Sequence, residues 1–403
     1  MAGSVPFEPS REDPSMAKEP IHVSLVVFPE CDPSIIYGVF DTLWAAGKLW
    51  NVCKGLPPGR ALFEPRLVSA EPGPLKLVTG VSIIPQDTIA DVARTDVVFV
   101  PNVMVDTPHS LRSLDRRLLD WIVRMHKKGA QLYAACGGSL VLAEAGLLDG
   151  HQATTHWSYV PLFRREFPNV ALHEDRILVQ CGEGHSMVCS GGASSWQDLA
   201  LLLVSKYGGT EEAIRMSKLF LYQWHRDGQL PYASMIQNVD HGDAVILKCQ
   251  TWIAENYERA DIVAELVSQS GLPKRTFDRR FRAATGYSPL AYIQTLRVEE
   301  AKQLLETSTM PAEAVGREVG YEDSASFRRL FRRLAGMPPG DYRRKFQMPS
   351  FADPRKKATT SPPKPKATAR APAHVSRSAT REPAAGRRAS VAASARLARA
   401  MRK

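Results

Sequence analysis

Cysteine is scarce in this 403-residue chain, and long apolar runs are missing from it. The six cysteines form no C-x-x-C pair and no cluster with histidine at zinc-finger spacing, so neither a disulfide framework nor a metal site is predicted. No run of about 18 apolar residues occurs, and the N-terminus MAGSVPFEPSREDPSMAKEP lacks the apolar core of a signal peptide. We therefore expect a protein of the reducing cytoplasm, without a membrane partner.

The net charge of +10 is unevenly distributed along the chain. Residues 351–403 contain 14 Lys and Arg against 2 Asp and Glu, whereas residues 240–350 contain 17 against 15. The segments 1–20 and 349–403 are predicted to be disordered, because they are too poor in large apolar residues to form a core. The basic tail is expected either to contact DNA phosphates through counterion release or to remain a solvated extension.

Between residues 21 and 225, strand-like and helix-like patterns alternate. The run IHVSLVVF (21–28) is almost continuously apolar, as expected for a strand that is buried on both faces. Such alternation predicts an α/β domain with a flavodoxin-like parallel sheet sandwiched between helices. The other expected elements are helices at 35–47, 113–129 (beginning at Ser113), 138–146, 196–206 and 211–224, and strands at 96–102, 131–136, 176–181 and 185–190.

A polar segment marked by Gly and Pro, residues 226–243, is predicted to be a linker to a second domain. From 244 to 348 every apolar pattern has the helical period, so this domain is expected to be all-α. Two helix-turn-helix units are predicted in it, connected by a longer helix. The first unit comprises 261–271 and 272–286, the second comprises 311–320 and 324–336, and the connecting helix is 288–306.

The second helix of each unit has an aromatic face opposite a basic face. At 100° per residue, Phe277 points away from Arg275 and Arg279, and Phe327 points away from Arg329 in the same manner. For a single helix, a solvated basic face would be an adequate explanation. Two matching units on one connecting helix instead favour recognition helices that enter successive major grooves, about 34 Å apart.

Residues 261–347 resemble the AraC/XylS family of DNA-binding regulators. The resemblance rests on GLPKRTFDRRF, RAATGYSP, LRVEEAKQLLE, VGYEDSASFRRLFRR and GMPPGDYRRKF. One departure is Pro273, where the family commonly has a capping serine whose loss costs about 1 kcal/mol. The resemblance implies that double-stranded DNA is the partner and that the bases are contacted by Arg275, Asp278, Arg279, Ser324, Ala325, Arg328 and Arg329.

The stretch QLYAACGGSLVLAEAGLLDG (131–150) predicts a strand that ends at Cys136 and a helix that Gly137 helps to open. This strand–turn–helix layout is that of a nucleophile elbow, and a helix N-terminus lowers the pKa of a thiol. His156, in the sequence TTHW, is a candidate base for such a nucleophile. The alternative is a small buried cysteine and a structural histidine.

Residues 21–207 resemble the PfpI type of class I glutamine amidotransferase-like domains, through AACGGSLVLAEAGLLDG, ATTHW and SGGASSWQDLALLL. Enzymes of that superfamily place an acidic residue beside the cysteine, whereas PECDPSIIYG has Ile35 at the matching position and Asp32 nearby. This departure puts catalysis in doubt. Followed by an AraC unit, the domain has the layout of GlxA-like regulators, in which the former enzyme serves as a ligand sensor.

The leading hypothesis is therefore a homodimeric, non-enzymatic transcriptional regulator without a cofactor. A small effector, expected to be a nitrogen-containing metabolite, would bind in a pocket that includes Cys136, Gly137 and His156. The alternative is a Cys-dependent amidase or glyoxal-type hydratase with an attached DNA-binding domain, which a carboxylate within hydrogen-bond reach of Cys136 would favour. A third possibility is that the α/β domain only dimerises the protein. Trp44, Trp157 and Trp196 are expected to form either an aromatic cage for a cation or part of the core.

Overall fold

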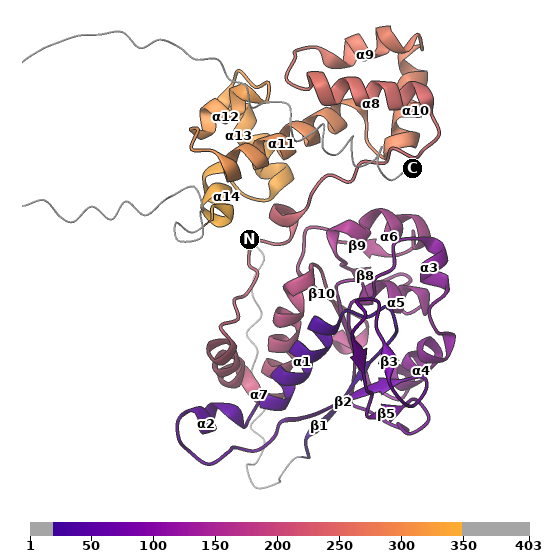
Figure 1. Ribbon diagram of the computed structural model, residues 1–403, viewed down its shortest axis with the longest axis vertical. Coiled ribbons are helices and arrows are strands. Elements are labelled where there is room, and N and C mark those ends of the chain that lie inside the picture. Colours follow the sequence, from indigo (N-terminus) through magenta and orange to yellow (C-terminus); the bar gives the residue numbers. More distant parts are fainter. Residues whose placement is uncertain (1–18, 349–403) are drawn as a thin grey trace, which may run out of the picture. The chain divides into compact units, whose positions relative to one another are not determined.

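The computed structural model describes residues 19–348, which divide at Ser234 and Met235 into two compact units. We call these the α/β unit and the helical unit (Figure 1). The division falls inside the segment 226–243 that was expected to be a linker. Of the two segments expected to be disordered, 1–18 and 349–403 lie outside the described residues.

The α/β unit is built on a seven-stranded sheet in the order β10-β11-β7-β6-β1-β2-β5. Every neighbouring pair is parallel except β10 and β11, which are antiparallel. This confirms the predicted, mostly parallel α/β fold. The strands are β1 (Ile21–Val26), β2 (Phe63–Ser69), β5 (Asp87–Thr88), β6 (Val97–Val100), β7 (Gln131–Ala135), β10 (Leu178–Cys181) and β11 (Met187–Ser190).

Helices cover both faces of the sheet, which explains why the central strands are apolar on both sides. Helices α1 (Pro33–Ala45) and α7 (Trp196–Phe220) pack together on one face, and α4 (Arg116–Lys127) and α5 (Gly138–Glu144) lie on the other (Figure 1). All four residues of β6 are buried between them. The smaller elements are α2 (Leu49–Cys53), α3 (Pro108–Arg112), α6 (Val160–Glu166), and the strand pairs β3 (Leu75–Lys76) with β4 (Ser82–Ile83) and β8 (Gln152–Ala153) with β9 (Ala171–Leu172).

Several predicted helix boundaries in the α/β unit are wrong by two or more residues, and the local structure explains two of them. Helix α4 begins after Asp115 rather than at Ser113, because the Asp115 carboxylate accepts the Arg117 backbone N–H at 2.9 Å. Two separate helices were predicted at 196–206 and 211–224. Helix α7 spans both, and its helical conformation is interrupted between them at Gly209, which has a φ of 82°. It ends at Phe220 and not at 224, because Leu221 adopts the left-handed conformation with φ 59°.

The helical unit contains two small cores that share one helix, α11 (Pro289–Thr307). Its first half contributes Tyr292, Ile293 and Leu296 to the core around Phe277, and its second half contributes Val298, Ala301 and Leu305 to the core around Phe327. The other helices are α8 (Ala244–Asn256), α9 (Ile262–Ser270), α10 (Lys274–Thr285), α12 (Ala312–Glu318), α13 (Ser324–Ala335) and α14 (Pro339–Phe346). No helix in the described part of the chain is both long and apolar enough to cross a bilayer.

Candidate DNA interface and elbow site

Helix α10 presents its basic residues to solvent because its aromatic residues are fully buried. Phe277 and Phe281 are each 0% exposed, whereas Arg275 and Arg279 are exposed. The preceding helix α9 ends at Gly271 in the left-handed conformation, and Pro273 stands at the N-cap of α10 without a side-chain cap. Helices α9 and α10 form the first helix-turn-helix motif in the predicted order.

The charged side chains of α10 differ in whether they form ion pairs or hydrogen bonds within the protein. Asp278 receives an ion pair from Lys274 at 3.1 Å. Within residues 19–348, by contrast, the guanidinium groups of Arg275 and Arg279 have no ion-pair or hydrogen-bond partner. These two arginines are therefore free to contact base edges or phosphates.

Helices α12 and α13 form the second motif, in which serine hydroxyls hold the arginines locally. Asp323 caps α13 by accepting the backbone N–H groups of Ala325 and Ser326, each at 3.0 Å. The Arg328 guanidinium donates to Ser324 Oγ at 3.3 Å, and that of Arg329 donates to Ser326 Oγ at 2.8 Å. Arg328 also forms an ion pair with Glu313 at 3.7 Å, and Arg329 forms one with Asp323 at 3.9 Å. Both arginines remain exposed, so contact with DNA requires these surface interactions to be exchanged.

The two motifs are held against each other by Arg297 in the middle of α11, a residue that the sequence analysis did not single out. Its guanidinium donates to the backbone carbonyls of Tyr257 at 2.6 Å, Arg259 at 2.8 Å and Gly320 at 3.1 Å. The first two carbonyls follow α8 and the third follows α12. Its position within LRVEEAKQLLE, between the residues that serve the two cores, is the only sequence signal of this role.

A close backbone approach next to Arg297 requires glycine. Gly320 has a φ of 89°, and a Cβ atom added there would lie 2.4 Å from the Glu258 carbonyl oxygen. The turn of the second motif therefore lies directly on the segment between α8 and α9. The contact is possible only because no side chain intervenes.

In the α/β unit, the predicted elbow is present but closed. Cys136 follows β7 with a φ of 57° and is only 3% exposed. The Gly137 backbone N–H donates to Asn102 Oδ1 at 2.9 Å. A Cβ atom on Gly137 would lie 2.6 Å from that oxygen and 2.8 Å from the Tyr159 ring. The space next to the elbow is thus already filled by side chains.

Cys136 is buried, as in the alternative of a small buried cysteine, and the following helix does not activate its thiol. Burial raises its pKa to about 12, and the nearby charge of Asp32 acts in the same direction. The helix that follows is short, and its effect does not offset the loss of water. Ile35, at the position expected for the acid, is 1% exposed and belongs to the core. Asp32 instead caps α1 by accepting the Ser34 N–H at 2.9 Å.

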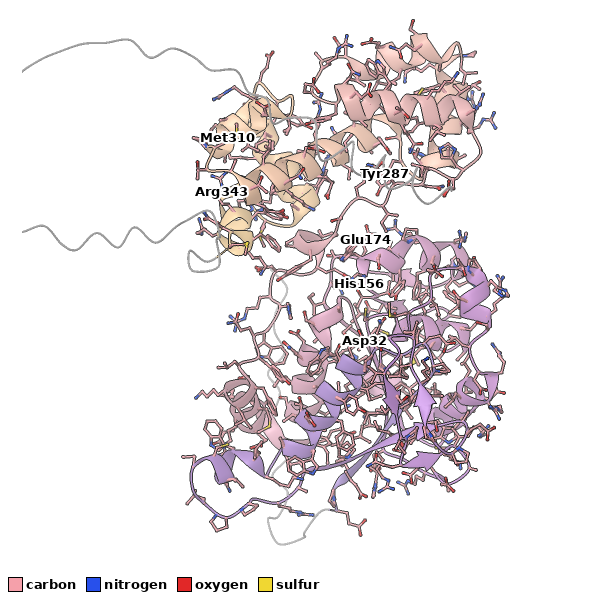
Figure 2. All side chains as sticks on the ribbon, viewed as in Figure 1. Asp32, His156, Glu174, Tyr287, Met310 and Arg343 are labelled. Atoms are coloured by element: carbon pink, nitrogen blue, oxygen red, sulfur yellow. The ribbon has the colours of Figure 1, made fainter. Side chains whose placement is uncertain are left out.

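His156 does not form a pair with Cys136 in the described structure. Its Nδ1 accepts the Ser158 backbone N–H at 3.1 Å and lies 2.6 Å from Ser158 Oγ. Burial lowers the pKa of the imidazole, so the ring is neutral at pH 7 with its proton on Nε2. Figure 2 labels His156 and Asp32 on the α/β unit. The neighbouring Thr155 does contact the elbow, because its hydroxyl donates to the Cys136 carbonyl at 3.2 Å.

The three tryptophans considered for an aromatic cage have different surroundings. Trp44 is 50% exposed and has the Lys48 ammonium over its ring at 4.0 Å. Trp196 packs edge-on against Tyr222 at 5.5 Å, and Trp157 lies 5.0 Å from the His156 ring. Each ring is occupied by a partner of its own, and nothing in these contacts brings the three together.

Thiol alkylation tests the closed elbow. We expect iodoacetamide to modify exposed Cys53 rapidly at pH 7 and Cys136 at least about 100-fold more slowly, because the thiolate is the nucleophile and that of Cys136 is scarce. The rate at Cys136 should rise about tenfold per pH unit between pH 7 and 10, since its pKa lies above this range. Mass spectrometry of both sites gives the rates. Rapid modification of Cys136 at pH 7 would contradict a buried, protonated thiol.

Comparison with known proteins identifies the two units separately. Residues 49–206 match the DJ-1/PfpI family, and residues 266–345 match a helix-turn-helix domain family. The HTH-type transcriptional regulator CdhR of Pseudomonas aeruginosa is 26% identical over 284 residues, which cover 70% of this chain and 82% of CdhR.

Two further transcriptional regulators are similar in sequence to this chain. The HTH-type transcriptional regulator GlxA of Rhizobium meliloti is 26% identical over 297 residues, covering 71% of this chain and 87% of GlxA. The regulator GbdR of Pseudomonas aeruginosa is 27% identical over 236 residues, which cover 58% of this chain and 62% of GbdR. The chain therefore carries a DJ-1/PfpI domain followed by an AraC-type helix-turn-helix domain, the arrangement expected of a GlxA-like transcriptional regulator.

Proposed function

We propose that this chain is a sequence-specific transcriptional regulator that binds double-stranded DNA through α10 and α13. One observation carries the proposal: two helices with buried aromatic residues and exposed arginines are fixed on the same helix, α11. Because both cores include α11, the spacing of the two recognition helices is set by the protein before DNA binds. A regulator of this kind acts in the cytoplasm, where promoter DNA lies.

The two motifs are proposed to contribute differently to recognition. Arg275 and Arg279 have unpaired guanidinium groups and can each bind guanine O6 and N7 in a bidentate manner. Arg328 must first leave Ser324 and Glu313, and Arg329 must leave Ser326 and Asp323. After that, each can contact a phosphate or a base edge. Asp278 and Ser324 complete the proposed DNA-facing set.

Alanine substitutions at Arg279 and Arg329 test the two-groove arrangement. Each is expected to weaken specific binding by about 1–3 kcal/mol and to relax the preference at base pairs about one helical turn from those affected by the other. Binding to a randomised operator library measures both effects. Arg317→Ala on α12 is the matched control, since Arg317 is exposed but lies outside the recognition helices. Protection of only one major groove per monomer would contradict the arrangement.

The α/β unit is proposed to bind a small, nitrogen-containing effector near Cys136, Gly137 and His156 and to dimerise the protein. The neutral His156, which presents an Nε2–H donor, supports a polar ligand. Binding beside Gly137 requires Asn102 and Tyr159 to move, because they fill that space. Such a ligand regulates DNA binding only if its affinity differs between two states of the protein. A thermal-shift screen of amino acids and quaternary amines on the intact chain tests binding, and sedimentation tests dimerisation.

We propose that Cys136 has no catalytic role. A thiol with a raised pKa and a histidine held by Ser158 lack the activated pair that an amidase or a glyoxal-type hydratase needs. Accordingly, Cys136→Ser should retain both promoter binding and the effector response. Turnover of an amide or of glyoxal that disappears in Cys136→Ser would overturn this and favour the enzyme.

A further inference from the structure

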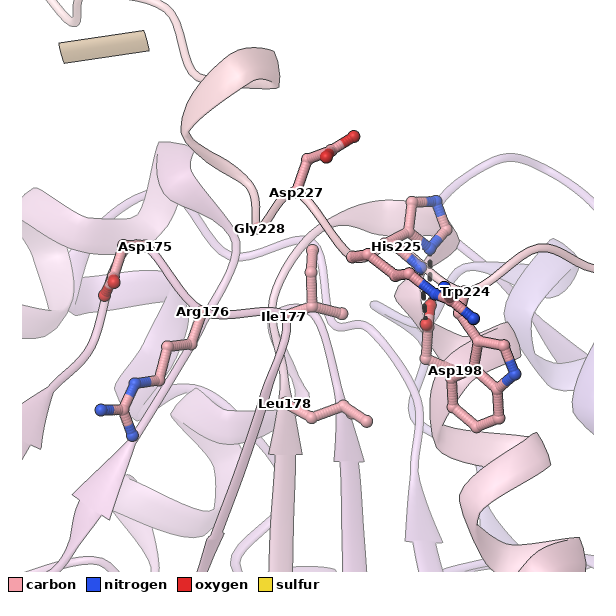
Figure 3. Close-up of a pocket in the computed structure, with 10 residues that line it drawn as sticks. Asp175, Arg176, Ile177, Leu178, Asp198, Trp224, His225, Asp227 and Gly228 are labelled. Carbon is pink, nitrogen blue, oxygen red and sulfur yellow. Dashed lines mark hydrogen bonds and ion pairs between the residues drawn. The ribbon is translucent and has the colours of Figure 1, made fainter. Parts of the chain in front are cut away.

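Hydrogen bonds join Ser194, Asp198 and His225 in the α/β unit. The proposed function uses none of these three residues. Ser194 is exposed in the short 3-10 turn Ala193–Ser195, Asp198 lies in the first turn of α7, and His225 follows the end of that helix. His225 Nε2 lies 3.2 Å from Ser194 Oγ, and His225 Nδ1 lies 2.5 Å from Asp198 Oδ2. Figure 3 shows the contact between His225 and Asp198.

The contacts assign a separate role to each of the three side chains. Asp198 is 2% exposed, and its carboxylate accepts both the His225 backbone N–H at 2.9 Å and the ring at Nδ1. A carboxylate at Nδ1 keeps a proton on that nitrogen and leaves Nε2 as an acceptor. Nε2 can therefore accept the hydroxyl proton of Ser194. This is the order of nucleophile, base and orienting acid, which is recognised by geometry and not by sequence position.

A pocket of about 470 Å³ adjoins His225 and Asp198. Its lining is mixed: Ile177, Leu178 and Trp224 are apolar (Figure 3), and the charged residues are Asp175, Arg176, Arg226 and Asp227. Trp224 is 41% exposed. Of the three hydrogen-bonded residues, His225 and Asp198 line the pocket, and Ser194 is reached from it through His225 Nε2, 3.2 Å from Ser194 Oγ.

Hydrogen-bond donors for a developing oxyanion are available beside the serine. Among the described residues, the backbone N–H groups of Ala193 and Ser194 have no acceptor. Both precede α7, a helix of 25 residues counted through its break at Gly209, whose positive end favours negative charge at this position. Backbone donors of this kind stabilise the tetrahedral intermediate of acyl transfer.

We propose that Ser194, His225 and Asp198 form a serine-hydrolase site for esters of short-chain carboxylic acids, an activity beyond the proposed regulation of transcription. Ser194 Oγ attacks the ester carbonyl carbon while its proton passes to His225 Nε2. The bond between the carbonyl carbon and the alcohol oxygen then breaks, and the alcohol leaves with that proton. Water attacks the acyl-Ser194 ester with His225 again as base, which releases the carboxylic acid and restores the serine. Asp198 stabilises the imidazolium in both steps.

The same unit contains an internal comparison. Ser158 Oγ lies 2.6 Å from His156 Nδ1, so this serine also contacts an imidazole. In the described residues, however, His156 has no carboxylate partner and its Nδ1 accepts a backbone N–H. The triad therefore predicts reactivity at Ser194 and none at Ser158.

The test treats the intact chain with a fluorophosphonate probe and maps the modified serine by mass spectrometry. We expect modification of Ser194, its loss in Ser194→Ala and His225→Gln, and no change in Ser158→Ala or Cys136→Ser. His225→Gln retains an N–H donor for Asp198 and removes the base. Its melting temperature is compared with that of the unmodified chain to test whether the α/β unit remains folded. For p-nitrophenyl butyrate, kcat/KM should fall at least about 100-fold in both triad variants.

Modification of Ser158 instead of Ser194, no modification of either serine, or full turnover in His225→Gln would overturn the proposal. The last result would leave the three residues as a structural clamp on the segment after α7. Promoter binding separates this proposal from the regulatory one, because Ser194→Ala should bind DNA as the unmodified chain does. Loss of esterase activity with DNA binding intact supports the triad, and failure of DNA binding by the unmodified chain bears only on the regulatory proposal.

Discussion

Arg297→Ala is expected to uncouple the two helix-turn-helix motifs and to lower the unfolding free energy of the helical unit by about 3 kcal/mol or more. Three backbone carbonyls, those of Tyr257, Arg259 and Gly320, lose their donor at once. A hydrogen bond to a charged group typically contributes about 1.5–3 kcal/mol, and a carbonyl left without a donor in a half-buried site adds a desolvation cost. Denaturant unfolding of the intact chain, followed by a probe in the helical unit, measures the loss.

Arg297→Ala should weaken binding to an operator with two half-sites more than binding to a single half-site. Without Arg297 the arrangement of α10 and α13 is held only by the packing of the two cores on α11. Binding to an operator with both half-sites must then include a larger cost of ordering them. Affinity for a single half-site should change little where the variant is folded. Arg297→Lys retains a charged donor but loses the planar guanidinium group. Its affinity for the operator with both half-sites should lie between those of the unmodified chain and Arg297→Ala. Arg317→Ala is the control, and unchanged affinity of Arg297→Ala for the two-groove operator would refute the coupling.

Phe277→Ala and Phe327→Ala should each destabilise their own motif by about 3–5 kcal/mol. Both side chains are 0% exposed, and they belong to separate cores. Phe277 packs against Phe281 with ring centroids 5.6 Å apart, and Phe327 packs against Phe331 at 5.7 Å. Either change leaves a cavity, and the closely packed neighbours relax only partly to fill it. Hydrogen exchange, resolved along the chain, should show lost protection in one motif only.

The DNA footprints of these two variants should be complementary. Phe277→Ala should lose protection in the groove contacted by α10, and Phe327→Ala should lose it in the groove contacted by α13. The corresponding leucine variants, which remove less volume, should cost less than about 1.5 kcal/mol and retain both footprints. If each alanine variant abolishes both footprints and protection throughout the helical unit, the two cores unfold as one and their independence is refuted.

The sequence alone determines those features that depend on neighbours along the chain. The period of apolar residues predicted the α/β alternation, and the spacing of Phe277 and Phe327 from nearby arginines predicted the two-sided recognition helices. Such patterns are local, because a helix repeats every 3.6 residues and a strand every two. The same logic located the elbow at Cys136, where a strand is followed directly by Gly137 and Gly138.

Properties that depend on residues distant in the chain were decided by the tertiary structure. The helix after Cys136 would by itself lower the thiol pKa, but burial of Cys136 by the fold raises it. The role of Arg297 likewise follows from carbonyls that the fold brings to α11 from both motifs. Ser194 and His225 come together because α7 ends at Phe220 and the chain turns back to Asp198. Desolvation and hydrogen-bond partners are set by three-dimensional neighbours, which periodicity along one segment does not specify.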